Sequence, residues 1–351
     1  MLLEKTSPPD ICRALRDALA SSASLDAAGC ELRCGLLAQL ARDGLADLPR
    51  PASGRTLERW RMLGCVAGHD LALAKLYEGH ADALAILAEA GVAADGAPGL
   101  TWGMWAAESP GARVVSTDEA QGRCRLDGVK AWCSGARHLD RALLTVWRPD
   151  GTGPFLAEVD LRQDGVSFID ANWRAVGMAH TGSLDVRFEG AGARLVGPAG
   201  FYLARSGFWH GGAGVAACWH GGACAIARVL RDQAGATAEP GWHRLTALGA
   251  IDRTLAASAA LLREAAAWID AHPRADAQLL ALRTRAVADA AAEITIGQAT
   301  RALGATPLCR DAFFARMVAD LPVFVRQSHG DRDLAALGRR ILGAAQPDWM
   351  P

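Results

Sequence analysis

The sequence lacks an excess of charge of either sign. Its 351 residues include 37 Lys and Arg against 38 Asp and Glu, which gives a formal net charge of -1 at pH 7. That balance argues against the basic surface of a nucleic-acid-binding protein and against a polyacidic tail. We therefore expect a small molecule, and no nucleic acid, as the partner. Lysine is scarce too, with three examples at positions 5, 75 and 130, in keeping with an Ala- and Arg-rich composition.

Paired cysteine motifs are also missing. The nine Cys are scattered singly, and the closest pair, Cys30 and Cys34, has neither CxxC spacing nor a His cluster nearby to complete a zinc site. A chain of this length buries a large core, so it needs no metal or disulfide in order to fold. We expect no metal site, and free thiols in a reducing cytosol.

Long apolar runs are absent as well. No stretch of 18 consecutive apolar residues occurs, and the first residues, MLLEKTSPPDICRALRDAL, place acids and prolines where a signal peptide needs an apolar core. These features predict a soluble, cytoplasmic protein that does not enter a membrane.

Hydrophobic periodicity divides the chain into three zones and predicts an α+β fold. Residues 1–98 have apolar residues at three- and four-residue spacing, which predicts an N-terminal helical domain. Residues 99–200 contain short Val- and Phe-rich segments between Gly, Pro and Asp turns, typical of a small antiparallel barrel or sandwich. Residues 201–351 return to the helical period, as in a four-helix-bundle-like domain. Six strands are expected, in ARVVSTD, CRLDGVKAWC, RALLTVWR, FLAEVDL, VSFIDA and LDVRFEG.

Four motifs in this order resemble the acyl-CoA dehydrogenase family and its flavin monooxygenase relatives. They are GMWAAESPGA, LDGVKAWCSGA, WRAVGMAHTGSLDVRFEGA and RDAFFARMVADLP. Each motif alone is weak, but their order covers nearly the whole chain. The resemblance implies an FAD-dependent oxidoreductase that acts on the CH–CH group of an acyl thioester such as an acyl-CoA, or of a related small substrate.

The first motif implies contacts to the flavin. In the family the segment matching residues 104–110 binds the pyrimidine side of FAD through backbone N–H groups and a hydroxyl. The resemblance assigns this contact to the backbone of Ala106 and Ala107, although the family's hydroxyl is missing at Ala107. Arg113 falls near the family's next hydroxyl, which contacts the pyrophosphate, and would pair with phosphate through its charge.

The second motif matches the family's Lys-x-Trp-x-Thr/Ser segment. The resemblance implies that Trp132 lies against the isoalloxazine ring and that Ser134 hydrogen-bonds flavin N5. A flat apolar ring covers a flavin face well, and a hydroxyl can follow N5 as it changes from acceptor to donor on reduction. Without the neighbouring motifs, a Trp between glycine turns is more often a core residue.

Substrate-pocket residues are proposed on two segments. In the third motif, Thr181 stands in a turn that borders the acyl pocket of the family, with a solvent-facing turn as the alternative. In LYEGHADAL, Glu78 and His80 are further candidates, although side chains two apart on a helix diverge by about 200°.

The glutamate with which the family's dehydrogenases remove an α-proton is missing from both of its usual places. The segment near the C-terminus that matches the first place reads RQSHGDRD, which leaves His329 and Asp331 as candidate catalytic residues. The second place, on the first helix after the β domain, reads SGFWHGGAGVAACWHGG and also has no Glu. Because proton abstraction needs a poised base, the missing glutamate argues against the ordinary dehydrogenase reaction.

Three hypotheses follow, with the electron acceptor or flavin reductase unknown. The first is an acyl-CoA dehydrogenase-like oxidoreductase, the second a reduced-flavin-dependent monooxygenase, and the third a non-catalytic subunit with the same fold.

The Arg-x-x-Phe-Gly segment by which one family subunit holds its neighbour's FAD is also missing. The Ala-rich C-terminal helices nevertheless favour a homo-oligomer, since small residues let helices approach closely.

Overall fold

The computed structural model describes residues 8–22, 25, 29–94, 99–119, 122–170 and 173–343. It divides into two compact units. Unit 1 comprises Met1–Leu48 and Ala72–Phe208, and unit 2 comprises Pro49–Leu71 and Trp209–Pro351. The expected order of helices, a central sheet and further helices is confirmed. The three domain boundaries drawn from the sequence stay a prediction.

Unit 1 combines helices with the sheet. Its helical elements are α1 (Pro8–Ser21), α2 (Cys30–Arg42), α4 (Leu71–Glu89), the 3₁₀ turn η2 (Ala179–Thr181) and α5 (Phe201–Ala204). The apolar residues of α4 recur every three or four positions, so that one face packs on the sheet. The resulting core joins Ala83, Ile86 and Leu87 of this helix to buried side chains of the strands, including Trp102 and Leu143.

The sheet contains seven strands in the order β1-β4-β5-β7-β3-β2, with β6 paired to β7. The strands are β1 (Trp102–Trp105), β2 (Val114–Asp118), β3 (Arg123–Cys133), β4 (Arg141–Val146), β5 (Phe155–Asp160), β6 (Val166–Ile169) and β7 (Leu184–Val196). The six expected strands are present, and the four-residue β1 is additional. It pairs with β4 in parallel, while the other pairs are antiparallel.

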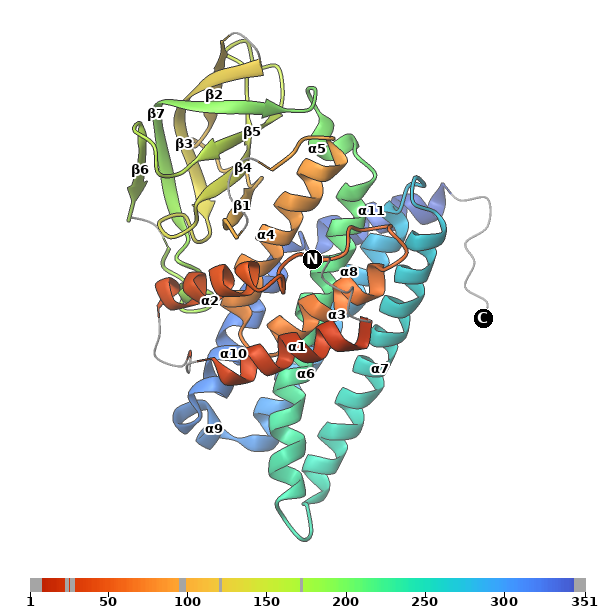
Figure 1. The fold of residues 1–351 in the computed structure, drawn as a ribbon. Coiled ribbons are helices and arrows are strands. Elements are labelled where there is room, and N and C mark those ends of the chain that lie inside the picture. Colours follow the sequence, from red (N-terminus) through yellow and green to blue (C-terminus); the bar gives the residue numbers. More distant parts are fainter. Residues whose placement is uncertain are drawn as a thin grey trace. The chain divides into compact units, whose positions relative to one another are not determined.

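The sheet closes on itself. The backbone N–H of Ser116 in β2 donates to the carbonyl of Trp147, just after β4, at 2.7 Å, and the N–H of Trp147 donates to Val114 at 3.0 Å. These bonds join β2 back to the end of β4 in a parallel bridge. Between the expected barrel and sandwich, the central domain is therefore a small barrel, drawn in yellow and green in Figure 1.

Unit 2 is helical. Its elements are α3 (Thr56–Ala67), α6 (Gly207–Gly235), α7 (Trp242–Ala271), α8 (Gln278–Leu303), α9 (Ala305–Arg310), α10 (Ala312–Phe324), the 3₁₀ turn η3 (Val325–Gln327) and α11 (Asp331–Leu342). The long helices α7 and α8 lie side by side (Figure 1). The carboxylate of Asp270 in α7 caps α3, because it accepts from the N–H of Thr56 at 3.0 Å and of Gly54 at 2.9 Å.

Two glycines bring α3 and α6 into backbone contact. A Cβ added at Gly221 would lie 2.2 Å from the carbonyl oxygen of Gly64, so this crossing has no room for a side chain. Such spacing explains why the first half of α6 is rich in Gly and Ala.

By length and composition alone, α6 and α7 could each cross a membrane. In α6, 72% of the apolar window is buried inside the structure, as in the core helix of a soluble protein, whereas in α7 the value is 22%. Much of the apolar surface of α7 is thus uncovered in the single chain.

Candidate flavin-binding site

The penultimate residue of strand β3 is a strained and exposed tryptophan. Trp132 has φ of 60°, in the left-handed region that non-glycine residues avoid, and it is 52% exposed. The pairing of β3 with β7 shifts register between Lys130 and Cys133, so the strand bulges at this point. A bulge redirects a side chain, and local strain is typical of functional sites. The ring is therefore presented outward at the place where the sequence predicts a flavin face.

Ser134 begins a chain of hydroxyl groups. Its Oγ lies 3.0 Å from Oγ of Ser183, which lies 2.8 Å from Oγ1 of Thr181. Thr181 in turn donates to the carbonyl oxygen of Met178 at 2.8 Å. The structure therefore brings together Ser134 and Thr181, which the sequence placed in the flavin contact and the substrate pocket respectively.

Two hydrogen bonds anchor the turn that carries Thr181. The carbonyl oxygen of Thr181 accepts from the backbone N–H of Gly135 at 2.8 Å and from the thiol of Cys30 at 3.2 Å. Thr181 itself is 1% exposed. The chain of hydroxyls consequently rests on a fixed, buried support rather than on a solvent-facing turn.

A buried lysine links the two segments expected to contact the flavin. Nζ of Lys130, on β3, lies 2.9 Å from Oε1 of Glu108 and 2.6 Å from Oγ1 of Thr145. The side chain of Lys130 is 2% exposed, and burial lowers its pKa while Glu108 acts in the opposite direction. The ion pair connects β3, the strand that carries Trp132, to the loop that follows Ala107.

The remaining predicted cofactor residues lie at the surface of unit 1. Ala106 and Ala107 follow β1, where the backbone leaves the sheet, half-buried and exposed respectively. Arg113 is exposed, and its guanidinium lies 4.6 Å from the ring centroid of Trp147. Its assignment to phosphate stays a prediction.

The two candidates on α4 have other contacts. Glu78 pairs with Lys75 at 2.9 Å, and the buried His80 accepts from the backbone N–H of Trp102 through Nδ1 at 3.2 Å. His80 thus helps fix β1 against α4. Their assignment to a substrate pocket stays a prediction.

The two catalytic candidates belong to unit 2. The side chain of His329 is 67% exposed, and its Nδ1 lies 3.5 Å from Oδ1 of Asp333. The same carboxylate accepts from the backbone N–H of His329 and from the hydroxyl of Ser328, each at 3.2 Å. Asp331 is the exposed first residue of α11. The imidazole is therefore oriented by a carboxylate, in a setting open to water.

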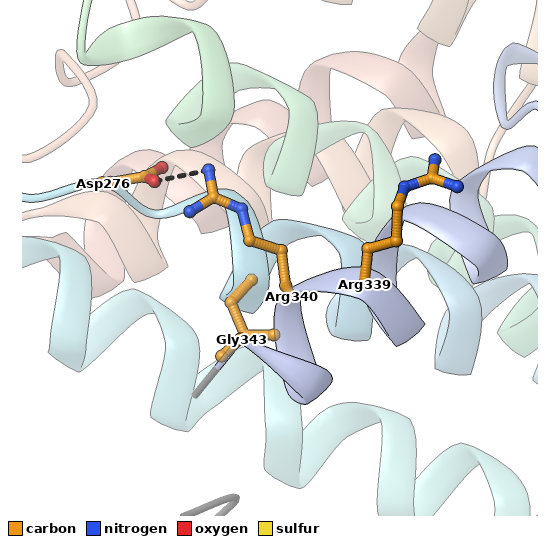
Figure 2. A pocket seen from close by; sticks show the side chains of 5 residues that line it. Asp276, Arg339, Arg340 and Gly343 are labelled. Atoms are coloured by element: carbon orange, nitrogen blue, oxygen red, sulfur yellow. Dashed lines mark ion pairs between the residues drawn. The ribbon is translucent and has the colours of Figure 1, made fainter. Parts of the chain in front are cut away.

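A cavity of about 390 Å³ also lies in unit 2 (Figure 2). It is lined by Asp276, Leu279, Arg339, Arg340 and Gly343. Arg340 points toward Asp276 and pairs with it at 2.8 Å, so its charge is already compensated. The lining includes none of the residues assigned from the sequence. In the part of the chain that the structure describes, no group of three His, Cys, Asp or Glu could hold a metal ion.

Comparison with solved structures identifies the fold. No protein-family model and no curated protein matches this sequence. KijD3, in complex with FMN and a dTDP-amino-keto sugar, aligns with a TM-score of 0.80 at 17% identity over 97% of this chain and 95% of that chain. Butyryl-CoA dehydrogenase from Megasphaera elsdenii aligns with a TM-score of 0.79 at 14% identity, over 97% of this chain and 100% of that chain. TdsC from Paenibacillus sp. A11-2, with FMN and indole, gives 0.77 at 18% identity over 97% and 98%. The chain has the acyl-CoA dehydrogenase fold.

Within this acyl-CoA dehydrogenase fold, sequence reasoning missed three of the residues that support the site. Lys130 is one of three lysines in the chain and stands two positions before Trp132 on a strand, a signal that was present. Ser183 had no sequence signal, because its contact with Thr181 depends on the left-handed Gly182 that ends the 3₁₀ turn η2. Thr145 had no sequence signal, because its contact with Lys130 depends on the pairing of distant segments.

Proposed function

We propose that this protein is a flavin-dependent oxidoreductase whose unit 1 holds the isoalloxazine ring against Trp132 with Ser134 at N5. The observation that carries the proposal is the exposed Trp132 ring, held in a left-handed conformation two residues before a hydroxyl with a buried support. At 52% exposure, Trp132 leaves much of its aromatic surface open to a ligand. Such a surface suits one face of a planar heteroaromatic ring.

The donor and acceptor groups of the site fit a flavin. Unit 1 contains an aromatic cover, a hydroxyl for N5 and the backbone groups of Ala106 and Ala107, which follow β1. The Lys130–Glu108 ion pair connects β3, which carries Trp132, to the loop that follows Ala107. A flavin supplies electron transfer to or from the substrate or oxygen when bound; the protein supplies the cover, the hydrogen bond and the fixed geometry.

We infer that the reaction is a monooxygenation with reduced flavin rather than a CH–CH dehydrogenation. The slot of the family's glutamate holds His329, whose side chain is 67% exposed. A base that removes a weakly acidic α-proton works best out of water, and an exposed imidazole is poorly suited to that task. TdsC, which aligns with this chain, is named a dibenzothiophene monooxygenase, and this supports the proposal. Dehydrogenation of an acyl thioester is the second candidate, supported by the fold of butyryl-CoA dehydrogenase.

FMN and FAD share the isoalloxazine ring, so the contacts at Trp132 and Ser134 serve either. The sequence resemblance predicts FAD. The missing Arg-x-x-Phe-Gly segment removes the family's hold on the adenosine half and favours FMN as the second possibility. Competition between the two flavins for the purified protein decides between them.

The test of function is a titration of the purified protein with FMN and with FAD, followed by the flavin absorbance band. Saturable binding supports the proposal, and oxygen consumption with added reduced flavin and a substrate identifies the monooxygenase. Anaerobic bleaching of bound oxidised flavin by an acyl-CoA would instead identify the dehydrogenase. A protein that takes up neither flavin in either redox state would favour the non-catalytic subunit.

A further inference from the structure

The hydroxyl chain that ends at Ser134 has one allowed direction. Thr181 Oγ1 lies 2.8 Å from the carbonyl oxygen of Met178, and two acceptors do not meet at that distance without a proton between them. Thr181 therefore donates to Met178. Because each hydroxyl carries a single proton, Thr181 must accept from Ser183, and Ser183 must accept from Ser134.

The consequence is that Ser134 meets its ligand as an acceptor. Its proton is directed at Ser183, so its remaining hydrogen-bonding capacity is two lone pairs. In an oxidised flavin, N5 is itself an acceptor and would oppose them. In a reduced flavin, N5 carries a hydrogen and would donate to them.

We propose that Ser183 and Thr181 act as positioning residues that make this site selective for reduced flavin. The inference rests on the proposed function, because it concerns the flavin that Ser134 contacts. It assigns the choice of redox state to side chains that stand behind Ser134.

Reversal of the chain is unfavourable for a structural reason. Ser183 is 9% exposed and Thr181 is 1% exposed, so water does not compete for their hydroxyls. To free the proton of Ser134 for an oxidised flavin, one hydrogen bond must be lost. Either Ser134 turns away and the Ser134–Ser183 bond breaks, or Ser183 and Thr181 turn as well and Thr181 faces Met178 with no proton. Loss of one such buried hydrogen bond corresponds to about a tenfold preference for reduced over oxidised flavin.

The experiment is an anaerobic redox titration of the bound flavin against a reference dye, in wild type and variants. Tighter binding of the reduced form raises the midpoint potential of the bound flavin, and a tenfold ratio corresponds to about 30 mV for a two-electron couple. Ser134→Ala, which removes the contact to N5, sets the reference potential. Wild type is expected about 30 mV above that reference.

Two variants probe the chain and two serve as controls. Ser183→Ala removes the acceptor for Ser134, and Thr181→Val removes the acceptor for Ser183; each is expected to bring the potential down to that of Ser134→Ala. Ser183→Thr keeps a hydroxyl and is expected to preserve the wild-type value. Ser116→Ala removes a buried hydroxyl of the same barrel that does not belong to the hydroxyl chain, and it is expected to leave the midpoint potential unchanged.

The outcomes separate this inference from the proposed function. A wild type that binds flavin at the Ser134→Ala potential, or a Ser183→Ala variant that keeps the wild-type potential, would overturn the inference while flavin binding stands. A protein that binds no flavin in either redox state would overturn the proposed function and the inference with it.

Discussion

Lys130 and Glu108 form an ion pair with Nζ 2.9 Å from Oε1, and the side chain of Glu108 is 40% exposed while that of Lys130 is 2% exposed. Lys130 therefore loses most of its hydration on folding, whereas Glu108 keeps much of its own. If Glu108 is lost, the ammonium remains buried; if Lys130 is lost, the carboxylate remains partly in water. The two halves of the pair are therefore not equivalent.

Glu108→Gln is expected to destabilise the protein more than Lys130→Met. An uncompensated buried charge costs several kcal/mol, and because Glu108 is partly exposed we expect the smaller figure of roughly 1–3 kcal/mol in the free energy of unfolding. Urea denaturation at neutral pH measures the difference. Equal losses in the two variants would show that the buried ammonium is not the decisive group.

The same variant has a predicted pH dependence. Burial lowers the pKa of Lys130, so the unfolded chain holds its proton more tightly than the folded chain, and stability rises with pH in that range. The deficit of Glu108→Gln should therefore shrink as the pH approaches the unfolded pKa of about 10.4. Denaturation midpoints at a series of alkaline pH values check the sign, with Lys130→Met as the variant that should lack this recovery.

Trp132 offers a separation of stability from binding. Because its φ is 60°, Trp132→Gly should be roughly 0.5–1 kcal/mol more stable than Trp132→Ala, since glycine adopts the left-handed region without strain. Both variants remove the aromatic cover and should bind flavin weakly. A glycine variant no more stable than the alanine variant would argue against strain at this position.

The contact between α3 and α6 predicts opposite effects for two glycines. Gly221→Ala should destabilise the protein by about 1–3 kcal/mol, because the new Cβ would lie 2.2 Å from the carbonyl oxygen of Gly64. Gly297→Ala, in α8 with nothing within 4 Å of the added Cβ, should stabilise it by about 0.5–1 kcal/mol. Thermal unfolding of both variants tests whether helix packing or helix propensity decides the sign.

The thiols of Cys30 and Cys34 should differ in reactivity although they lie 3.6 Å apart. The hydrogen bond from Cys34 lowers the pKa of the Cys30 thiol, and the adjacent Arg33 acts in the same direction. The same hydrogen bond and burial raise the pKa of Cys34. Alkylation with iodoacetamide, mapped by peptide mass spectrometry, should therefore label Cys30 first; preferential labelling of Cys34 would contradict this order.

The sequence predicted the parts of the fold that depend on local periodicity. Helical and extended patterns gave the order of helices, barrel and helices, because apolar spacing reports which face of each element is buried. Strand β1 escaped detection, since four residues carry too little pattern and its parallel partner β4 lies far along the chain.

The candidate site was predictable only where a motif is contiguous. Trp132 and Ser134 stand together in one motif and could be proposed from it. The bond between Ser134 and Ser183 joins residues 49 apart in sequence, and the contact of Glu108 with Lys130 joins residues 22 apart. Such pairs depend on the register of the barrel, which hydrophobic patterning does not specify residue by residue.

Flavin binding at Trp132 is the central claim, and one titration tests it most directly. Wild type and Trp132→Gly are each titrated anaerobically with reduced FMN and reduced FAD, with binding followed by equilibrium dialysis. We predict saturable binding of at least one flavin to wild type, and affinity weaker by about tenfold or more in the variant, as expected when an aromatic stacking partner and its buried area are lost. Equal affinity of the two proteins, or no binding of either flavin to wild type, would contradict it.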